Sequence, residues 1–172
     1  MRVVANAGPI IWLAKIGRLD LLEKLYGEAS IPKEVYLESV QKGLEHGFRD
    51  ALIIKEASDK GWIKIVELNE AQSTIRDRIT HQLKELDAGE IEAIVYAKDT
   101  GADLILLDDS TARSFAESWG LETKGTLYIL LKALKTDLLD VKETRGLIYE
   151  LVERGFRIDP RLFAKLIKRL EK

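Results

Sequence analysis

Two spacings of apolar residues alternate along the chain. Short runs rich in Val, Ile and Leu, typical of buried strands, occupy residues 2–5, 29–31, 63–66 and 103–107. Between these runs, apolar residues recur every three or four positions, as they do on one face of a helix. Strands that alternate with helices favour a parallel sheet covered by helices on both faces. The pattern therefore predicts an α/β fold.

Prolines and glycines mark where the predicted helices begin and end. Pro9 and Pro32 suit first helical turns, and Gly17, Gly27 and Gly120 stop helices. The expected helices cover about 10–16, 19–25, 32–40, 47–58, 87–97, 111–119, 126–134, 141–154 and 161–170. Two segments are less regular: residues 71–86 form either a polar helix or a mobile arm, and residues 121–123 an edge strand.

Composition narrows the class of protein and of site. The 172 residues fit one domain, or one domain with a helical extension, and a hydrophobic content of 46% supports a sizeable core. The net charge of -2 argues against binding nucleic acid by bulk positive charge, although it leaves room for a local basic rim. With no signal-peptide pattern and no apolar run of membrane-spanning length, we expect a cytoplasmic protein.

The absence of cysteine restricts the possible metals. Disulfides, thiolate zinc sites and a cysteine nucleophile are excluded. Any metal must be held by oxygen ligands, with at most His46 and His81 as nitrogen donors, and neither histidine has a partner at ligand spacing. These preferences point to Mg²⁺ or Mn²⁺. Both histidines are expected on the surface.

Carboxylate and amide side chains recur where an open α/β sheet binds its ligands, beyond the carboxyl ends of the strands. They are Asn6 after the first strand, Glu38 after Ile31-Pro32, Asp87, Glu90 and Glu92 on one predicted helix, and Asp108 and Asp109 after the central strand. Oxygen ligands from separate elements are what a magnesium site requires. The pattern therefore indicates a site for a divalent metal.

Each of these residues also has a purely structural interpretation. Asp87 and Glu90 match a capping box, with Asp87 as N-cap. Either aspartate after the central strand, or Ser110, could cap the next helix. Glu38 could be solvated helix surface, and Asn6 before Gly-Pro could be an N-cap or turn residue. The order of the residues along the chain decides between the two interpretations.

In that order, the sequence resembles the PIN-like domain family. The matching motifs are residues 3–11 (VVANAGPII), 15–22 (KIGRLDLL), 31–38 (IPKEVYLE), 86–93 (LDAGEIEA), 107–113 (LDDSTAR) and 125–127 (GTL). The nearest branch is a prokaryotic group of uncharacterised PIN-like proteins regarded as nucleic-acid-binding and similar to toxin-type ribonucleases. The resemblance covers about 1–135 and extends toward the C-terminus. We therefore expect a domain core over 1–135 and a helical extension over 136–172, which packs on the same domain or on a dimer partner.

The resemblance implies a three-layer α/β/α sandwich with a parallel sheet, and ribonuclease chemistry that depends on Mg²⁺ or Mn²⁺. Many relatives are toxins of toxin–antitoxin pairs and form homodimers, so RNA, a small antitoxin and a second copy are the implied partners. By position, the catalytic and metal-binding residues are Asn6, Glu38, Glu90, Asp108 and Asp109. The choice between Asp108 and Asp109 stays open at this point.

Asn6 departs from the family pattern, because the first strand of such domains normally ends in a catalytic aspartate. An amide oxygen can ligate magnesium, but it adds no negative charge and cannot accept a proton as a carboxylate does. In an active site, the carboxylates would hold one or two metals and Asn6 would position the attacking water. Arg113, one helical turn beyond Asp109, either contacts phosphate or orients the carboxylate pair, and we favour orientation.

Three functions fit these features. The leading one is a metal-dependent endoribonuclease, in one version the toxin of a toxin–antitoxin pair. The second, favoured by Asn6, is a catalytically weak or inactive module that binds RNA or a small protein. The third is a receiver-like phosphoacceptor domain. Its paired aspartates would have to lie near the first strand, where only Asn6 stands.

Overall fold

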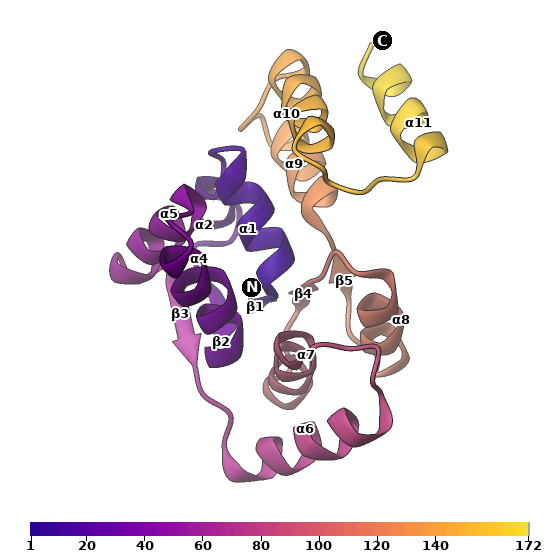
Figure 1. Ribbon diagram of the computed structural model, residues 1–172. Helices are drawn as coiled ribbons and strands as arrows, with labels where there is room; N and C mark the ends of the chain where they lie inside the picture. The colour runs from indigo at the N-terminus through magenta and orange to yellow at the C-terminus, as the bar shows by residue number, and fades with distance from the viewer. Residues whose placement is uncertain (172) are drawn as a thin grey trace. The chain divides into compact units, whose positions relative to one another are not determined.

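A computed structural model of the protein describes residues 1–171 and contains one five-stranded parallel sheet with helices on its faces (Figure 1). The order across the sheet is β3-β2-β1-β4-β5. The strands are β1 (Val3–Ala5), β2 (Ala29–Pro32), β3 (Ile63–Val66), β4 (Leu104–Leu106) and β5 (Thr123–Lys124). Each predicted apolar run forms a strand, and β5 lies at the sheet edge, as expected. The predicted α/β sandwich is confirmed.

The helices follow the predicted spacing closely. They are α1 (Ala7–Lys15), α2 (Asp20–Tyr26), α3 (Lys33–Tyr36), α4 (Lys42–Glu45), α5 (Arg49–Asp59), α6 (Glu70–Gln82), α7 (Ala88–Thr100), α8 (Ser110–Ser118), α9 (Thr126–Lys135), α10 (Val141–Glu153) and α11 (Pro160–Leu170). The single helix expected after Pro32 is instead three pieces, because the π-helical turn η1 (Leu37–Gln41) separates α3 from α4. The polar segment from 71 is a helix rather than a mobile arm.

The strand order reverses direction at β1. The chain runs from β1 outward through β2 to β3, and then returns to the other side of β1 to add β4 and β5. Since crossovers between parallel strands are right-handed, this reversal places the connecting helices on opposite faces of the sheet. The carboxyl ends of β1 and β4 are neighbours, with Ala5 paired to Leu106. Such a reversal point is where open sheets bind ligands.

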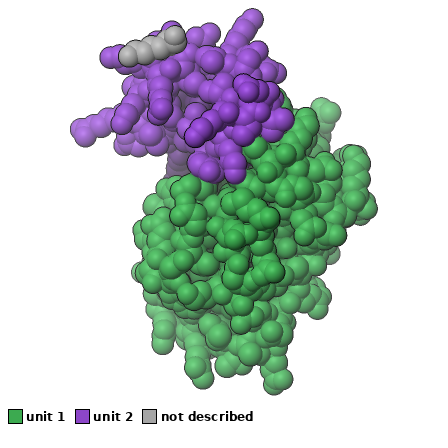
Figure 2. All heavy atoms as spheres, turned by 180° about the vertical axis from the view of Figure 1, so that it is seen from behind, with its two compact units in different colours: residues 1–126 green, residues 127–172 purple. Residues whose placement is uncertain are grey.

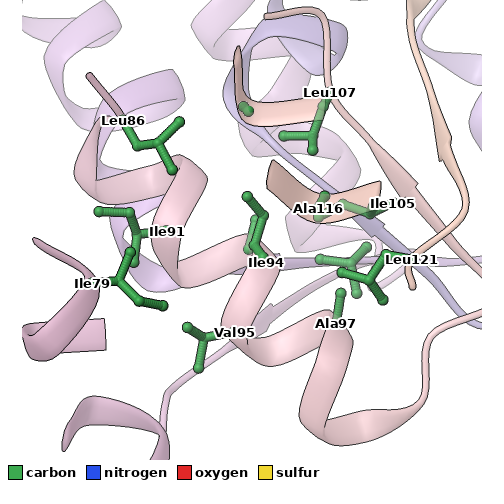
Figure 3. Close-up of a cluster of buried hydrophobic side chains, with 13 residues drawn as sticks. Ile79, Leu86, Ile91, Ile94, Val95, Ala97, Ile105, Leu107, Ala116 and Leu121 are labelled. Atoms are coloured by element: carbon green, nitrogen blue, oxygen red, sulfur yellow. The ribbon is translucent and has the colours of Figure 1, made fainter. Parts of the chain in front are cut away.

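Helix α7 forms the centre of one layer. It packs against β1, β2 and β4 and against α3, α6 and α8, so its residues from Gly89 to Val95 are all buried. Figure 3 shows the resulting cluster, in which Ile91 and Ile94 of α7 lie among side chains from α6, β4 and α8. The α6 segment is fixed to α7 by polar contacts as well, because Arg76 Nη1 donates to Glu92 Oε1 at 2.9 Å.

The chain divides into two compact units, residues 1–126 and 127–172 (Figure 2). The second unit contains α10 and α11, joined by an edge-on contact between the rings of Tyr149 and Phe163, whose centroids are 5.5 Å apart. The expected division at residue 135 stays a prediction. Among residues 1–171, no helix combines the length and apolar character needed to cross a bilayer.

Candidate metal centre

The candidate site lies at the reversal point of the sheet. Asn6 follows β1 directly, and its backbone N–H donates to Leu106 O at 3.0 Å, so Asn6 continues the pairing between β1 and β4. Asp108 and Asp109 come two and three residues after that carbonyl. The backbone alone therefore brings the residues after β1 and β4 to one edge of the sheet.

The Asn6 side chain is buried and incompletely satisfied. Asn6 is only 6% exposed and occupies the N-cap position of α1, but its side chain makes no capping hydrogen bond. Its Oδ1 has no hydrogen-bond partner. A buried oxygen without a donor costs about 1–3 kcal/mol. A bound cation is one kind of partner that would remove this penalty.

Glu38 is carried by the π-helical turn rather than by regular helix. Ser39 Oγ donates to Val35 O at 2.6 Å, a local bond of the kind that perturbs helical geometry. Single π-turns inside helices are frequent at functional sites. Glu38 is half-buried, not the solvated surface residue of the structural interpretation. Burial raises the pKa of its carboxyl group, repulsion from Asp87 adds to the rise, and the charge of Lys42 opposes it.

Gly89 brings Asn6 and Glu38 to the start of α7. A methyl group at Gly89 would lie 3.2 Å from Glu38 Oε2 and 3.3 Å from Asn6 Oδ1. These two oxygens therefore flank the same point on the first turn of α7. A larger residue at 89 would push against both.

Glu90 fills a structural role and also shows a strongly perturbed carboxyl group. It forms the predicted capping box, because Asp87 N donates to Glu90 Oε2 at 3.0 Å and Glu90 N donates to Asp87 Oδ1 at 2.7 Å. Burial raises the pKa of Glu90 to about 7; the hydrogen bond from the Asp87 backbone opposes the rise, and the charges of Asp87, Asp109 and Glu38 add to it. Glu90 is thus both a cap and one of several mutually repelling carboxylates.

Asp108 has partners for both of its oxygens. Thr126 N donates to Asp108 Oδ1 at 2.7 Å, and Thr126 Oγ1 donates to Asp108 Oδ2 at 2.6 Å. Burial raises the pKa of Asp108, while the bonds from Thr126 and the charge of Arg113 lower it. Gly125 permits this approach, since a methyl group there would lie 2.7 Å from Asp108 Oδ1. Asp108 is therefore held by hydrogen bonds before any ligand is considered.

Asp109 caps α8. Its Oδ1 accepts hydrogen bonds from Thr111 N at 2.8 Å and Ala112 N at 2.9 Å. Its charge still acts on Glu90. Arg113 lies on the Asp108 side instead, with Nη1 3.8 Å from where a methyl group at Gly125 would be. This position is consistent with an orienting role for Arg113, which stays a prediction.

Comparison with known proteins agrees with this arrangement. A sequence profile described as a PIN domain matches residues 2–172. The chain belongs to the PIN-domain family. Among curated proteins, no match to the chain is found. The family has a nuclease-like fold, and its members are generally nucleases that use divalent metals.

The PIN-domain residues have the oxygen ligands that a hard cation requires, but their side chains are not yet arranged around a metal ion. The unpartnered Asn6 Oδ1 lies with Glu38 at Gly89, and the charge of Glu38 acts on Glu90; these residues offer oxygen ligands of the kind that Mg²⁺ and Mn²⁺ prefer. Within residues 1–171, however, no three His, Asp or Glu side chains are already close enough to enclose a metal ion. A metal here would need Asn6 and water to complete its shell, and magnesium commonly retains several waters.

Three acidic or basic side chains, those of Glu92, His46 and His81, fall outside this PIN-domain centre. Glu92 is engaged by α3 and α6 instead, since its Oε2 accepts a hydrogen bond from Glu34 N at 3.3 Å and its Oε1 pairs with Arg76. His46 and His81 are exposed, as expected. The structure thus brings Asn6, Glu38, Glu90 and Asp109 toward one another, with Asp108 anchored beside them.

Sequence reasoning assigned no role to Thr126 or Gly89. Thr126 is fully buried and supplies both hydrogen bonds to Asp108. Its signal was the Gly125-Thr126 pair, which the resemblance had singled out without a function. Gly89 gives Asn6 and Glu38 room at α7, and its position between two acidic residues in the sequence was the available clue.

Proposed function

We propose that this protein is an endoribonuclease that depends on Mg²⁺ or Mn²⁺, with its centre at the carboxyl edge of the sheet. The observation that carries the proposal is the buried Asn6 Oδ1, which has no hydrogen-bond donor and lies beside Glu38. The raised pKa of Glu90 supports it, because burial and neighbouring carboxylates favour its neutral form until a cation offsets them. Membership of a nuclease family gives the reaction class.

The residues have different parts in this proposal. Asn6, Glu38, Glu90 and Asp109 hold the metal, and Asp108 supports them from its fixed position on Thr126. When bound, the cation activates water and stabilises negative charge on the phosphodiester. Glu90 must release its proton before it can ligate a cation, so metal binding should weaken below about pH 7. Arg113 orients Asp108.

A second candidate is a PIN-domain module that binds RNA or a small protein without cleaving it. Two features favour this candidate: an amide stands where the family resemblance implies an aspartate, and no preassembled ligand cage exists within residues 1–171. A role as a toxin, a small antitoxin partner, a homodimer and a cytoplasmic location stay predictions under either candidate.

The test is cleavage of single-stranded RNA by the purified full chain. We expect Mn²⁺ or Mg²⁺ to support cleavage and EDTA to stop it. The double variant Glu90→Gln/Asp109→Asn should lose roughly 100-fold or more, since it removes two charges from the centre. The matched control is Glu85→Gln/Glu153→Gln, which removes two exposed carboxylates that have no part in the site.

Cleavage that is equal in the wild type and in Glu90→Gln/Asp109→Asn would overturn the catalytic proposal. RNA binding without cleavage in any metal would favour the second candidate. In that case Asn6→Asp gives the deciding comparison: if the restored carboxylate produces cleavage, Asn6 attenuates an intact centre.

A further inference from the structure

A pocket of about 380 Å³ opens next to the candidate centre, and Glu38 lines it. The pocket lies among α1, η1, α4 and the beginning of α5. Its lining includes Lys15, Lys42, His46 and Phe48. We call this feature the His46 pocket. Its volume falls in the range typical of small-molecule sites.

Two stacked rings form one wall of the His46 pocket. The rings of His46 and Phe48 have centroids 5.6 Å apart and planes inclined by 17°. Gly47 between them has a φ of +72°, a left-handed conformation that lets the chain turn back at this point. Phe48 is 54% exposed, an unusual position for a large apolar ring. The turn therefore presents a flat aromatic surface to the solvent.

The hydrogen bonding of His46 is also defined. Its Nδ1 lies 2.7 Å from Lys42 O. Because a carbonyl oxygen can only accept, Nδ1 carries the hydrogen, and Nε2 of the neutral ring is left as an acceptor. The ring is thus fixed from one side and has a polar atom available on the other.

The charges around the pocket suit a phosphate chain that passes close to an acidic centre. Lys42 lies near enough to Glu38 for its charge to act on that carboxylate. Lys15 places its ammonium group 4.7 Å from the centroid of the Trp12 ring. Asp50 and Glu38 are the opposing charges in the lining. The two lysines balance these two carboxylates, so the pocket gives Lys15 and Lys42 to a phosphate chain without a net positive surface.

We propose that the His46 pocket holds one unpaired nucleobase of single-stranded RNA, stacked on Phe48, while Lys42 and Lys15 contact the adjoining phosphates. This inference rests on the proposed function, because Glu38 belongs to both the pocket and the metal centre. The base in the pocket is then a neighbour of the phosphodiester at the centre. Proteins that bind single strands commonly stack unpaired bases on exposed aromatic rings beside basic side chains.

The test measures RNA binding separately from cleavage. Fluorescence anisotropy of a labelled single-stranded RNA is recorded with the full chain carrying Glu90→Gln/Asp109→Asn, which the proposed function expects to block cleavage. Adding Phe48→Ala should weaken binding about 5- to 150-fold, since stacking of one base contributes roughly 1–3 kcal/mol. Phe48→Tyr keeps the ring and should retain affinity. The matched control is Leu52→Ala, which removes a similarly exposed apolar side chain outside the pocket lining.

An abasic substitution identifies the base itself. A series of RNAs is made, each with one abasic nucleotide at a different position. At one position the missing base should weaken binding to the protein that has Phe48. The same missing base should have no further effect on the Phe48→Ala protein. Lys42→Gln should weaken binding and reduce its salt dependence. Duplex RNA of the same sequence should bind without dependence on Phe48.

The outcomes separate this proposal from the proposed function. Unchanged affinity in Phe48→Ala overturns the base pocket, whatever the result for metal-dependent cleavage. Equal losses of RNA affinity in Phe48→Ala and Leu52→Ala also overturn the base pocket. They would indicate an unspecific apolar surface, of the kind that contacts another protein. Loss confined to Phe48→Ala in a protein that never cleaves RNA supports the pocket and rejects the nuclease.

Discussion

The two sides of the candidate centre differ in whether their buried oxygen atoms have hydrogen-bond donors. On one side, Asp108 receives two hydrogen bonds from Thr126 and lies near the positive charge of Arg113. On the other side, Asn6 Oδ1 has no donor, and Glu90 shares its surroundings with other carboxylates. The Asp108 side is satisfied by the protein itself, and the Asn6 side is not. The comparison separates residues that stabilise the carboxyl edge of the sheet from residues whose oxygen atoms can still bind a ligand.

The largest effect on stability should come from breaking the satisfied side. Asp108→Ala leaves the N–H and hydroxyl of Thr126 without their acceptor, so we expect the free energy of unfolding to fall by about 2–4 kcal/mol. Urea denaturation of the metal-free protein measures this change. The control Asp59→Ala removes an exposed ion pair with Lys55 and should cost less than about 1 kcal/mol. Equal losses in the two variants would contradict the distinction drawn above.

Removing a charge from the unsatisfied side should raise the free energy of unfolding. The pKa of Glu90 in the folded protein is about 7, above its ordinary value of 4.5, so the folded state holds this proton more tightly than the unfolded state. Stability from this group is therefore fully present below about pH 4.5 and is lost as the pH rises through 7. Glu90→Gln should raise the free energy of unfolding by about 1–3 kcal/mol at pH 8 relative to wild type, and by little at pH 4.5.

Urea titrations across this pH range, without metal, check the Glu90 prediction. Glu85→Gln, at an exposed position, serves as the control and should show no such pH dependence. A Glu90→Gln variant that is less stable than wild type at pH 8 would mean that the capping bond to Asp87 outweighs the buried charge.

The contrast between the two sides also shows how far the sequence could lead. The apolar runs and the capping signals predicted the strands, the parallel sheet and the Asp87–Glu90 box, since these depend on local spacing. The family resemblance supplied the set of candidate residues. Neither could distinguish the environments of Asp108 and Asp109, because that distinction depends on hydrogen bonds from Thr126, which follows the carboxyl end of β5 and lies 18 positions farther along the chain than Asp108. The π-turn under Glu38 was also missed, since its apolar spacing looks like ordinary helix.

A divalent metal should bind on the unsatisfied side, and its affinity should depend on the residue at position 6. We expect Asn6→Asp to be less stable than wild type without metal, because it adds a charge near Glu38, whose own charge already acts on Glu90. With Mn²⁺ the difference in stability between the two proteins should become smaller or change sign, because the added carboxylate tightens Mn²⁺ binding by about tenfold, or roughly 1.4 kcal/mol. Thermal unfolding at several Mn²⁺ concentrations gives both quantities. Identical Mn²⁺ responses of the two proteins would exclude residue 6 from the metal site.

The smallest effect on stability should come from Gly89→Ala, which sharpens the comparison by disturbing only the unsatisfied side. Alanine favours a helix over glycine by up to about 1 kcal/mol, and Gly146→Ala in α10 should gain close to this amount because its added methyl group meets nothing. At Gly89 the methyl group would press on Glu38 Oε2 and Asn6 Oδ1 at 3.2 and 3.3 Å, which offsets the gain and leaves a change below about 0.5 kcal/mol. Calorimetric titration with Mn²⁺ should nevertheless show several-fold weaker binding for Gly89→Ala alone. If both alanine variants bind Mn²⁺ like the wild type, the oxygens that flank Gly89 do not form the metal site, and the ligand must lie nearer to Asp108.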